Sequence, residues 1–191
     1  HLWFKSGGRC NYYYNKKIFK GYNFSSNAGY GFADAYKTTA EVYDKSMGKD
    51  GHLNSPSSSY YIFKCFGYIR LKPKDVVLLD VGCGNGKILV SGIYKGFKKV
   101  YGVDLDSTGL KAAKENCAKA ANSFTSTTYE IIKADAAKYN IPSDVNVIFL
   151  YNPFGYTTLK QVIENTEASY RASTREIYLL YYSPEFSKAV E

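Results

Sequence analysis

The sequence predicts an α/β fold built on a mostly parallel sheet. Two observations predict it: short apolar runs alternate with segments of helical periodicity, and residues 76–81 form a run that is apolar except for Asp80. Such a run is typical of a strand buried on both faces. Strands that alternate with helices favour right-handed crossovers and therefore parallel pairing. A chain of 191 residues is long enough for one domain with a sizeable core.

The expected elements follow in order along the chain. Residues 60–71 predict a helix because Tyr61, Cys65 and Tyr68 fall on one helical face. After the strand at 76–81 and a glycine-rich turn, we expect helix 86–94, strand 99–104, helix 107–121, strand 128–133, strand 145–151, helix 157–169 and strand 176–182. Asp106 or Ser107 suits the N-cap of the helix at 107.

The N-terminal part of the chain differs from the rest in charge. The net charge is +8, and residues 1–70 hold ten Lys or Arg against four Asp or Glu, together with ten of the twenty tyrosines. A basic, aromatic segment suits a nucleic-acid or other anionic partner, although a solvated basic face over an aromatic core explains the same bias. We expect residues 1–59 to form a Tyr-rich extension that serves as a substrate lid, and residues 60–191 to form the cofactor-binding domain.

Composition disfavours membrane, disulfide and metal chemistry. The sequence has no apolar stretch near the roughly 20 residues of a membrane span. The four cysteines form no CxxC pair, and the two histidines are too few for a multi-histidine metal site. No set of carboxylates suggests a Mg²⁺ site either. We therefore expect reduced thiols, no metal and a cytoplasmic location.

A glycine-rich turn is the strongest chemical signal. Residues 82–86 read Gly-Cys-Gly-Asn-Gly directly after the first strand and open a helix. Glycines let a backbone approach a ligand closely, and a helix N-terminus binds anions. The G-x-G-x-G spacing differs from the G-x-G-x-x-G that seats a dinucleotide pyrophosphate, so it disfavours an NAD-dependent oxidoreductase. Asp104 follows at the end of the second strand, where a carboxylate accepts hydrogen bonds from ribose hydroxyls.

Residues 77–86 resemble motif I of class I S-adenosylmethionine-dependent methyltransferases, and the resemblance extends over residues 60–183. It implies a Rossmann-like sheet, S-adenosylmethionine as cofactor and methyltransferase activity. It further implies that Asp80 and the glycine backbone hold the methionine end, Asp104 the ribose, and Asp135 with the Ala136 N–H the adenine amine. The implied cofactor-binding set is Asp80, Gly82, Cys83, Gly84, Asn85, Gly86, Asp104, Leu105, Asp135, Ala136 and Asn152.

A second motif follows the strand at 145–151. Asn152, Pro153 and Phe154 are similar to the [D/N]-P-P-[Y/F/W] motif of amino-group methyltransferases, with one proline in place of two. The resemblance implies that the Asn152 amide oxygen accepts the hydrogens of the target amine and that Phe154 stacks on a planar target or a cation. The alternative is a proline turn that caps the next helix. His52 and Glu185 are further candidates near the substrate, and each is equally consistent with a surface position.

The resemblance leaves the acceptor open. It favours N-methylation of a protein or nucleic-acid amine; the alternatives are a sugar or other small metabolite, and a scaffold that keeps the fold without the activity. Class I sheets have seven strands, whereas the last strand expected here ends at 182. We therefore expect the C-terminal strands to be missing, so that the chain is a fragment or a second chain, such as another copy, covers the sheet edge.

Overall fold

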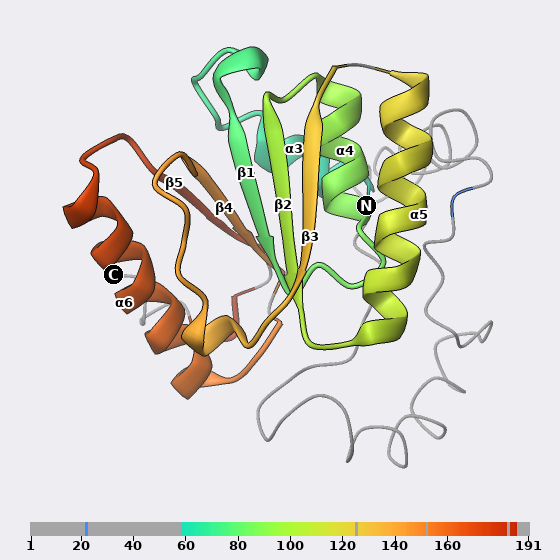
Figure 1. The fold of residues 1–191 in the computed structure, drawn as a ribbon. Helices are drawn as coiled ribbons and strands as arrows, with labels where there is room; N and C mark the ends of the chain where they lie inside the picture. The colour runs from blue at the N-terminus through green and yellow to red at the C-terminus, as the bar shows by residue number, and fades with distance from the viewer. Residues whose placement is uncertain (1–21, 23–58, 125, 152, 183, 187–191) are drawn as a thin grey trace, which may run out of the picture.

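The computed structural model describes residues 22, 59–124, 126–151, 153–182 and 184–186. This part of the chain forms a five-stranded sheet in the order β3-β2-β1-β4-β5, and every neighbouring pair is parallel (Figure 1). The strands are β1 (Val77–Val81), β2 (Lys99–Asp104), β3 (Thr128–Lys133), β4 (Val147–Leu150) and β5 (Tyr178–Tyr181). The predicted α/β fold with its Rossmann-like sheet is therefore confirmed.

The helices cover both faces of the sheet. One face carries α3 (Ser59–Phe66), α4 (Lys87–Lys95) and α5 (Ser107–Ser123), and the opposite face carries α6 (Tyr156–Ala172) (Figure 1). Two short 3₁₀ helices, η2 (Pro73–Asp75) and η3 (Ala136–Lys138), lie in the connections before β1 and after β3. Within the described residues, none of these helices is long and apolar enough to span a bilayer.

The predicted strands at 99–104 and 128–133 are confirmed residue for residue, whereas the first helix ends early. Helix α3 stops at Phe66 instead of 71, and the next N–H groups bond in tighter turns, as from Tyr68 to the Cys65 carbonyl (3.0 Å). Gly67 follows the last helical residue directly, and glycine loses more conformational freedom in a helix than any other residue. The apolar periodicity through Tyr68 and Ile69 thus belongs to a turn.

Two apolar clusters flank the sheet, and β1 contributes to both. Leu78 packs with α4 and α5 residues on one face, while Val77, Leu79 and Val81 pack on the α6 face. All five residues of β1 are buried. The apolar run at 76–81 therefore marks a strand that is buried on both faces, as predicted, because each face of β1 packs against a layer of helices.

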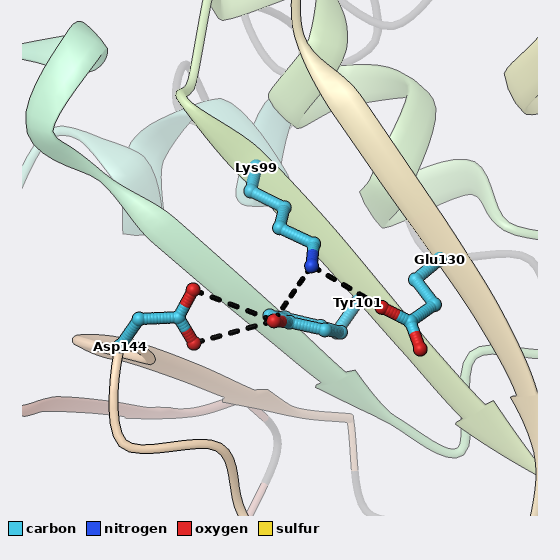
Figure 2. Close-up of polar contacts among 4 residues, drawn as sticks. All are labelled: Lys99, Tyr101, Glu130 and Asp144. Carbon is cyan, nitrogen blue, oxygen red and sulfur yellow. Dashed lines mark hydrogen bonds and ion pairs between the residues drawn. The ribbon is translucent and has the colours of Figure 1, made fainter.

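A polar cluster occupies the amino-terminal half of β2, on the sheet face shared with α6 (Figure 2). The Lys99 ammonium donates to the Tyr101 hydroxyl oxygen (2.7 Å) and pairs with Glu130 (3.2 Å). The Tyr101 hydroxyl in turn donates to the Asp144 carboxylate (3.3 Å). The hydrogen bond to Tyr101 and the pair with Glu130 raise the pKa of Lys99. These contacts connect β2, β3 and the loop before β4, away from the carboxyl ends of the strands.

Most of the predicted N-terminal extension lies outside the described residues, and so does His52. Of residues 1–58, the structure describes Tyr22, whose ring packs against the cluster on the α4 and α5 face. The Lys119 ammonium of α5 lies 4.9 Å from the centre of that ring. A role of the extension as a substrate lid stays a prediction.

Candidate cofactor and acceptor site

The glycine-rich turn lies at the carboxyl end of the sheet, where the strand order reverses. Strand β1 pairs with β2 on one side and with β4 on the other, so residues 82–86 emerge between the ends of these two neighbours. Parallel α/β sheets place their ligand sites at such switch points. The fold therefore brings the turn, the end of β2 and the loop after β4 together.

The turn requires glycine at the positions where the sequence has it. Gly82, Gly84 and Gly86 have φ angles of 80°, 48° and 77°, in the left-handed region that residues with a Cβ rarely adopt. A Cβ on Gly86 would also lie 3.0 Å from the Cβ of Ala113 in α5. The N–H groups of Gly82 and Cys83 both donate to the Val103 carbonyl, at 2.8 and 3.1 Å. The turn is thus bonded to β2 and packed under α5.

Asp104 at the end of β2 binds this turn directly. Its Oδ2 accepts the Gly84 N–H (2.7 Å), and its Oδ1 accepts the Asp106 N–H (2.9 Å). Burial raises the pKa of Asp104, and those two N–H donors lower it. Each carboxylate oxygen can accept a second hydrogen bond, so the side chain keeps acceptor capacity for a ligand. The N-cap of α5 is Asp106, which accepts from Thr108 and Gly109, so Asp104 is not the cap.

Asp80 is a buried carboxylate with an unsatisfied oxygen. Its side chain is 2% exposed, and its Oδ2 has no hydrogen-bond partner within the described residues. Burial raises the pKa of Asp80 well above its ordinary value of 3.8, and the neighbouring Asp104 raises it further. A buried charge without a partner is costly. A ligand that brings a cation or an N–H donor to this carboxylate would remove part of that cost.

The remaining predicted cofactor residues line the turn or the strand ends. The buried Cys83 thiol lies under the turn, and burial raises its pKa well above 9.0, so it stays protonated. The Asn85 carbonyl accepts the Asn116 side-chain amide of α5 (2.9 Å). Leu105 follows β2 and is 37% exposed.

Asp135 and Ala136 follow β3, as the sequence predicted. The Asp135 carboxylate caps η3 by accepting the Ala137 N–H (3.0 Å), so it is not simply a solvated loop carboxylate. Ala136 is the first residue of η3 and packs against the apolar cluster on the α6 face. Their contact with an adenine amine stays a prediction.

The loop after β4 packs on the glycine turn. A Cβ built on Gly82 would lie 2.5 Å from the Cβ of Pro153, so the loop approaches because Gly82 has no side chain. Asn152 lies outside the described residues. Phe154 is 6% exposed and packs in the α6-face cluster. A ring so buried presents little surface to a substrate, which argues against the stacking role suggested for Phe154. Gly155 is the N-cap of α6.

Three features of the site were not singled out from the sequence. Lys87 is the first residue of α4, and burial lowers its pKa to about 8.

The second feature is the close approach of Gly109 in α5 to the Gly84 backbone, since a Cβ on Gly109 would lie 3.2 Å from the Gly84 carbonyl. The third is a pair of tyrosines. Tyr151 and Tyr182, each directly after a strand, contact each other at the carboxyl end of the sheet. Their positions after apolar runs were the available signal for the two tyrosines. Within the described residues, no group of three or more metal-ligating side chains is placed to hold a metal ion.

The fold and the turn define the class of this protein. The sheet order, the glycine turn after β1 and the acid at the end of β2 are those of the class I S-adenosylmethionine-dependent methyltransferase fold, the class whose cofactor is S-adenosylmethionine. A family model described as Methyltransferase domain matches residues 78–173, half of the chain. The chain belongs to this family.

Curated relatives carry related names. The Type II methyltransferase M.VspI of Vibrio sp. (strain 343) is 26% identical over 127 residues, which cover 61% of this chain and 29% of that protein. The Ribosomal protein L11 methyltransferase of Staphylococcus carnosus is 34% identical over 73 residues, which cover 37% of this chain and 23% of that protein. The chain therefore spans less than a third of the length of these relatives.

Solved structures share the fold. A methyltransferase from Geobacter sulfurreducens, in complex with S-adenosyl-L-homocysteine, matches with a TM-score of 0.51 and 20% identity, covering 68% of this chain and 50% of that one. One from Thiobacillus denitrificans, also in complex with S-adenosyl-L-homocysteine, matches with the same TM-score and coverage at 19% identity. At these identities the likeness shows the arrangement of the sheet and helices.

Proposed function

We propose that this chain is the catalytic domain of an S-adenosylmethionine-dependent methyltransferase that methylates a nitrogen of a protein or nucleic acid. The observation that carries the proposal is the contact between Gly82 and Pro153. It brings Pro153, from the loop whose sequence resembles the amino-group methyltransferase motif, against the glycine turn. Cofactor and acceptor would therefore meet at one place, which a transfer reaction requires.

The residues of the turn fit the cofactor. When bound, S-adenosylmethionine supplies a methyl group on a positively charged sulfur. The unsatisfied Asp80 oxygen is a partner for the positive methionine end, and the N-terminus of α4 suits its carboxylate. The second acceptor positions of Asp104 suit the ribose hydroxyls. Glycines at 82, 84 and 86 leave the backbone open to close approach.

The acceptor side supports nitrogen as the target. Transfer needs a neutral nitrogen lone pair held in line and protected from water. The Asn152 amide oxygen, together with a backbone carbonyl of the loop, would accept the hydrogens of the amine and leave its lone pair directed at the turn. Phe154, the last residue of this loop, would hold the loop in position by packing into the α6-face cluster.

Calorimetric titration of the chain with S-adenosylmethionine, S-adenosylhomocysteine and NADH tests the cofactor assignment. We expect saturable binding of the first two, weakened in Asp104→Ala, and no binding of NADH. Saturable NADH binding would favour an oxidoreductase, and wild-type affinity in Asp104→Ala would remove Asp104 from the ribose site.

Transfer of a radiolabelled methyl group tests the reaction. The chain is incubated with labelled cofactor and, separately, with RNA, single-stranded DNA, mixed protein and a metabolite extract. We expect label in nucleic acid or protein, and a larger loss of turnover than of cofactor affinity in Asn152→Ala. Label found only in the metabolite extract would show that the acceptor is a small molecule and not a protein or nucleic acid. Tight binding without transfer to any fraction would instead support a scaffold.

A further inference from the structure

Three tyrosine rings gather where β4 and β5 end. Tyr151 directly follows β4, and Tyr182 directly follows β5. The Tyr182 N–H donates to the Leu150 carbonyl (2.8 Å), which continues the parallel ladder and sets these two tyrosines side by side. Their ring centroids are 4.9 Å apart at 42°, and the Tyr61 ring of α3 stacks on Tyr182 at 5.2 Å and 28°. We call these three residues the tyrosine trio.

The trio lies beside the glycine turn. In the β1–β4 ladder Val81 pairs with Leu150, so Tyr151 is level with Gly82, the first residue of the turn. Tyr151 and Tyr182 pack on the sheet face that carries α4 and α5. Because side chains alternate along a strand, Asp80 points to this same face. The trio therefore continues the site from the turn toward β5.

The trio differs from an ordinary piece of core. All three tyrosines are partly exposed, whereas Phe149 and Phe66 of the core cluster on the same face are buried. Burial, followed by the neighbouring Tyr151 and Tyr61, raises the pKa of Tyr182 to about 12, so its hydroxyl stays a donor at neutral pH. The trio thus presents partly exposed aromatic rings at the sheet end where α/β proteins bind ligands.

Charge favours a nucleic acid over a protein as the source of the ligand. The segments that carry the trio, residues 60–66, 149–151 and 180–182, contain Lys64 and no Asp or Glu. Asp80, the carboxylate on the same sheet face, is the one proposed for the methionine end of the cofactor. A lysine target would arrive as a cation and favour carboxylates, whereas a nucleobase is planar, uncharged and followed by phosphates. Net charge +8 agrees with a polyanionic partner.

We propose that Tyr61, Tyr151 and Tyr182 form a stacking surface for a nucleobase of a single-stranded nucleic acid, which presents its exocyclic amine toward the glycine turn where Pro153 meets Gly82. The inference rests on the proposed function and names its acceptor. An exocyclic amine is reached only when the base has left its stack, and aromatic side chains replace the lost stacking. Because every base has a π-face, the trio supplies affinity and leaves the choice of base to other contacts.

Fluorescence anisotropy of the full chain, saturated with S-adenosylhomocysteine, tests the stacking surface without any mutation. Two labelled single-stranded 12-mers of equal charge are compared, one of deoxyadenosine and one in which all twelve positions are abasic. We expect the complete oligonucleotide to bind at least about fivefold more tightly, since stacking on aromatic side chains discriminates a base from a bare backbone. Equal affinities would overturn the inference, because phosphate contacts alone would then explain binding.

Substitutions test whether the preference for the base-containing oligonucleotide comes from the tyrosine trio. Tyr151→Leu and Tyr182→Leu are expected to weaken binding of the complete oligonucleotide by about tenfold and to leave abasic binding unchanged. Tyr182→Phe keeps the ring and should stay within about twofold. The control is Tyr170→Leu, a 46% exposed ring on α6, which should have no effect. Loss of binding in the control, or none in the trio variants, would contradict the proposal.

The two proposals fail in different ways. If S-adenosylhomocysteine does not bind by calorimetry, the proposed function fails whatever the oligonucleotides do. If it binds and the base-containing oligonucleotide has no advantage, the nucleobase surface alone is refuted. Methyl label that goes to lysine-containing protein, and not to oligonucleotides, would likewise refute the nucleobase surface and retain the methyltransferase.

Discussion

The Asp104 carboxylate accepts the Gly84 backbone N–H at 2.7 Å, joining the end of β2 to the centre of the glycine turn. The same carboxylate accepts the Asp106 N–H at 2.9 Å, which fixes the start of the next connection. Asp104 therefore has a structural role besides the ribose role proposed for it. A substitution there should affect both the turn and the ligand, and the two effects can be separated.

Replacing Asp104 with alanine should weaken cofactor binding and destabilise the fold. The variant loses two backbone hydrogen bonds and the acceptor for the ribose hydroxyls. Hydrogen bonds to charged groups contribute about 1.5–3 kcal/mol, so we expect S-adenosylhomocysteine affinity to fall by roughly ten- to a hundredfold. Calorimetry measures the affinity, and urea unfolding of the free chain measures the stability.

Asp106→Ala is the matched control for Asp104→Ala. It removes the N-cap of α5 and should cost about 1 kcal/mol of unfolding free energy with cofactor affinity nearly unchanged. If both variants lose affinity equally, the effect of Asp104→Ala comes from loosening of α5, and the ribose role is wrong.

Gly82→Ala should disrupt the contact between the turn and the acceptor loop. The new Cβ would lie 2.5 Å from Pro153, and the φ of 80° is unfavourable for alanine. We expect a loss of about 2–4 kcal/mol in unfolding free energy, combining backbone strain with overpacking, and a loss of methyl transfer. Gly96→Ala, with a φ of 74° at the C-cap of α4, controls for strain alone. It should cost about 1–2 kcal/mol and keep cofactor affinity.

Asp80→Asn should change how stability depends on pH. Because the pKa of Asp80 is raised on folding, the folded state holds this proton more tightly than the unfolded state. The contribution to stability is therefore fully present below pH 3.8 and is lost as pH rises toward the raised pKa. Asparagine does not ionise, so the stability of the variant relative to the wild type should increase from about pH 4 upward.

Thermal unfolding of the ligand-free proteins between pH 4 and pH 8 measures this difference. Asp75→Asn, the same carboxyl-to-amide change at an exposed position in η2, is measured beside it as the matched substitution. We also expect Asp80→Asn to bind S-adenosylmethionine more weakly, because the ligand loses its charged partner. A constant offset between Asp80→Asn and the wild type at every pH would refute the assignment of a raised pKa to Asp80.

The sequence predicted features that depend on local patterns. Strands at 99–104 and 128–133 and the cap at Asp106 follow from apolar runs and from the preference of Asp for helix N-termini. The turn was recognisable from its glycines, because its positive φ angles are accessible to few residues other than glycine. Local chemistry decided each of these, so no knowledge of distant contacts was needed.

Features that depend on contacts between distant segments were not predictable in the same way. Phe154 lies in a motif whose aromatic residue suggested stacking, yet packing against α6 and β1 residues buries it. Asp80 reads as a polar break in an apolar run, and only the sheet shows that its Oδ2 is buried without a partner in the described residues. The tyrosine trio needs the β4–β5 register before Tyr151 and Tyr182 become neighbours.

Arg175, after α6, should be important for stability and irrelevant to the site. Its guanidinium donates to the Val145 carbonyl (2.6 Å), to the Ser173 carbonyl (2.7 Å) and to both the carbonyl and the hydroxyl of Ser169. It thereby fastens the end of α6 to the loop before β4. Lysine has the charge but not the planar set of donors, so Arg175→Lys leaves several of these partly buried acceptors unsatisfied.

We expect Arg175→Lys to lower the unfolding free energy by about 2–4 kcal/mol in urea denaturation, with S-adenosylhomocysteine affinity within about twofold of wild type. Arg171→Lys is the matched control, because Arg171 is exposed and pairs with Glu167 one turn earlier in α6. Exposed pairs contribute little, so this variant should stay within about 0.5 kcal/mol of wild type. Equal effects of the two substitutions would show that the carbonyl contacts of Arg175 add nothing beyond its charge.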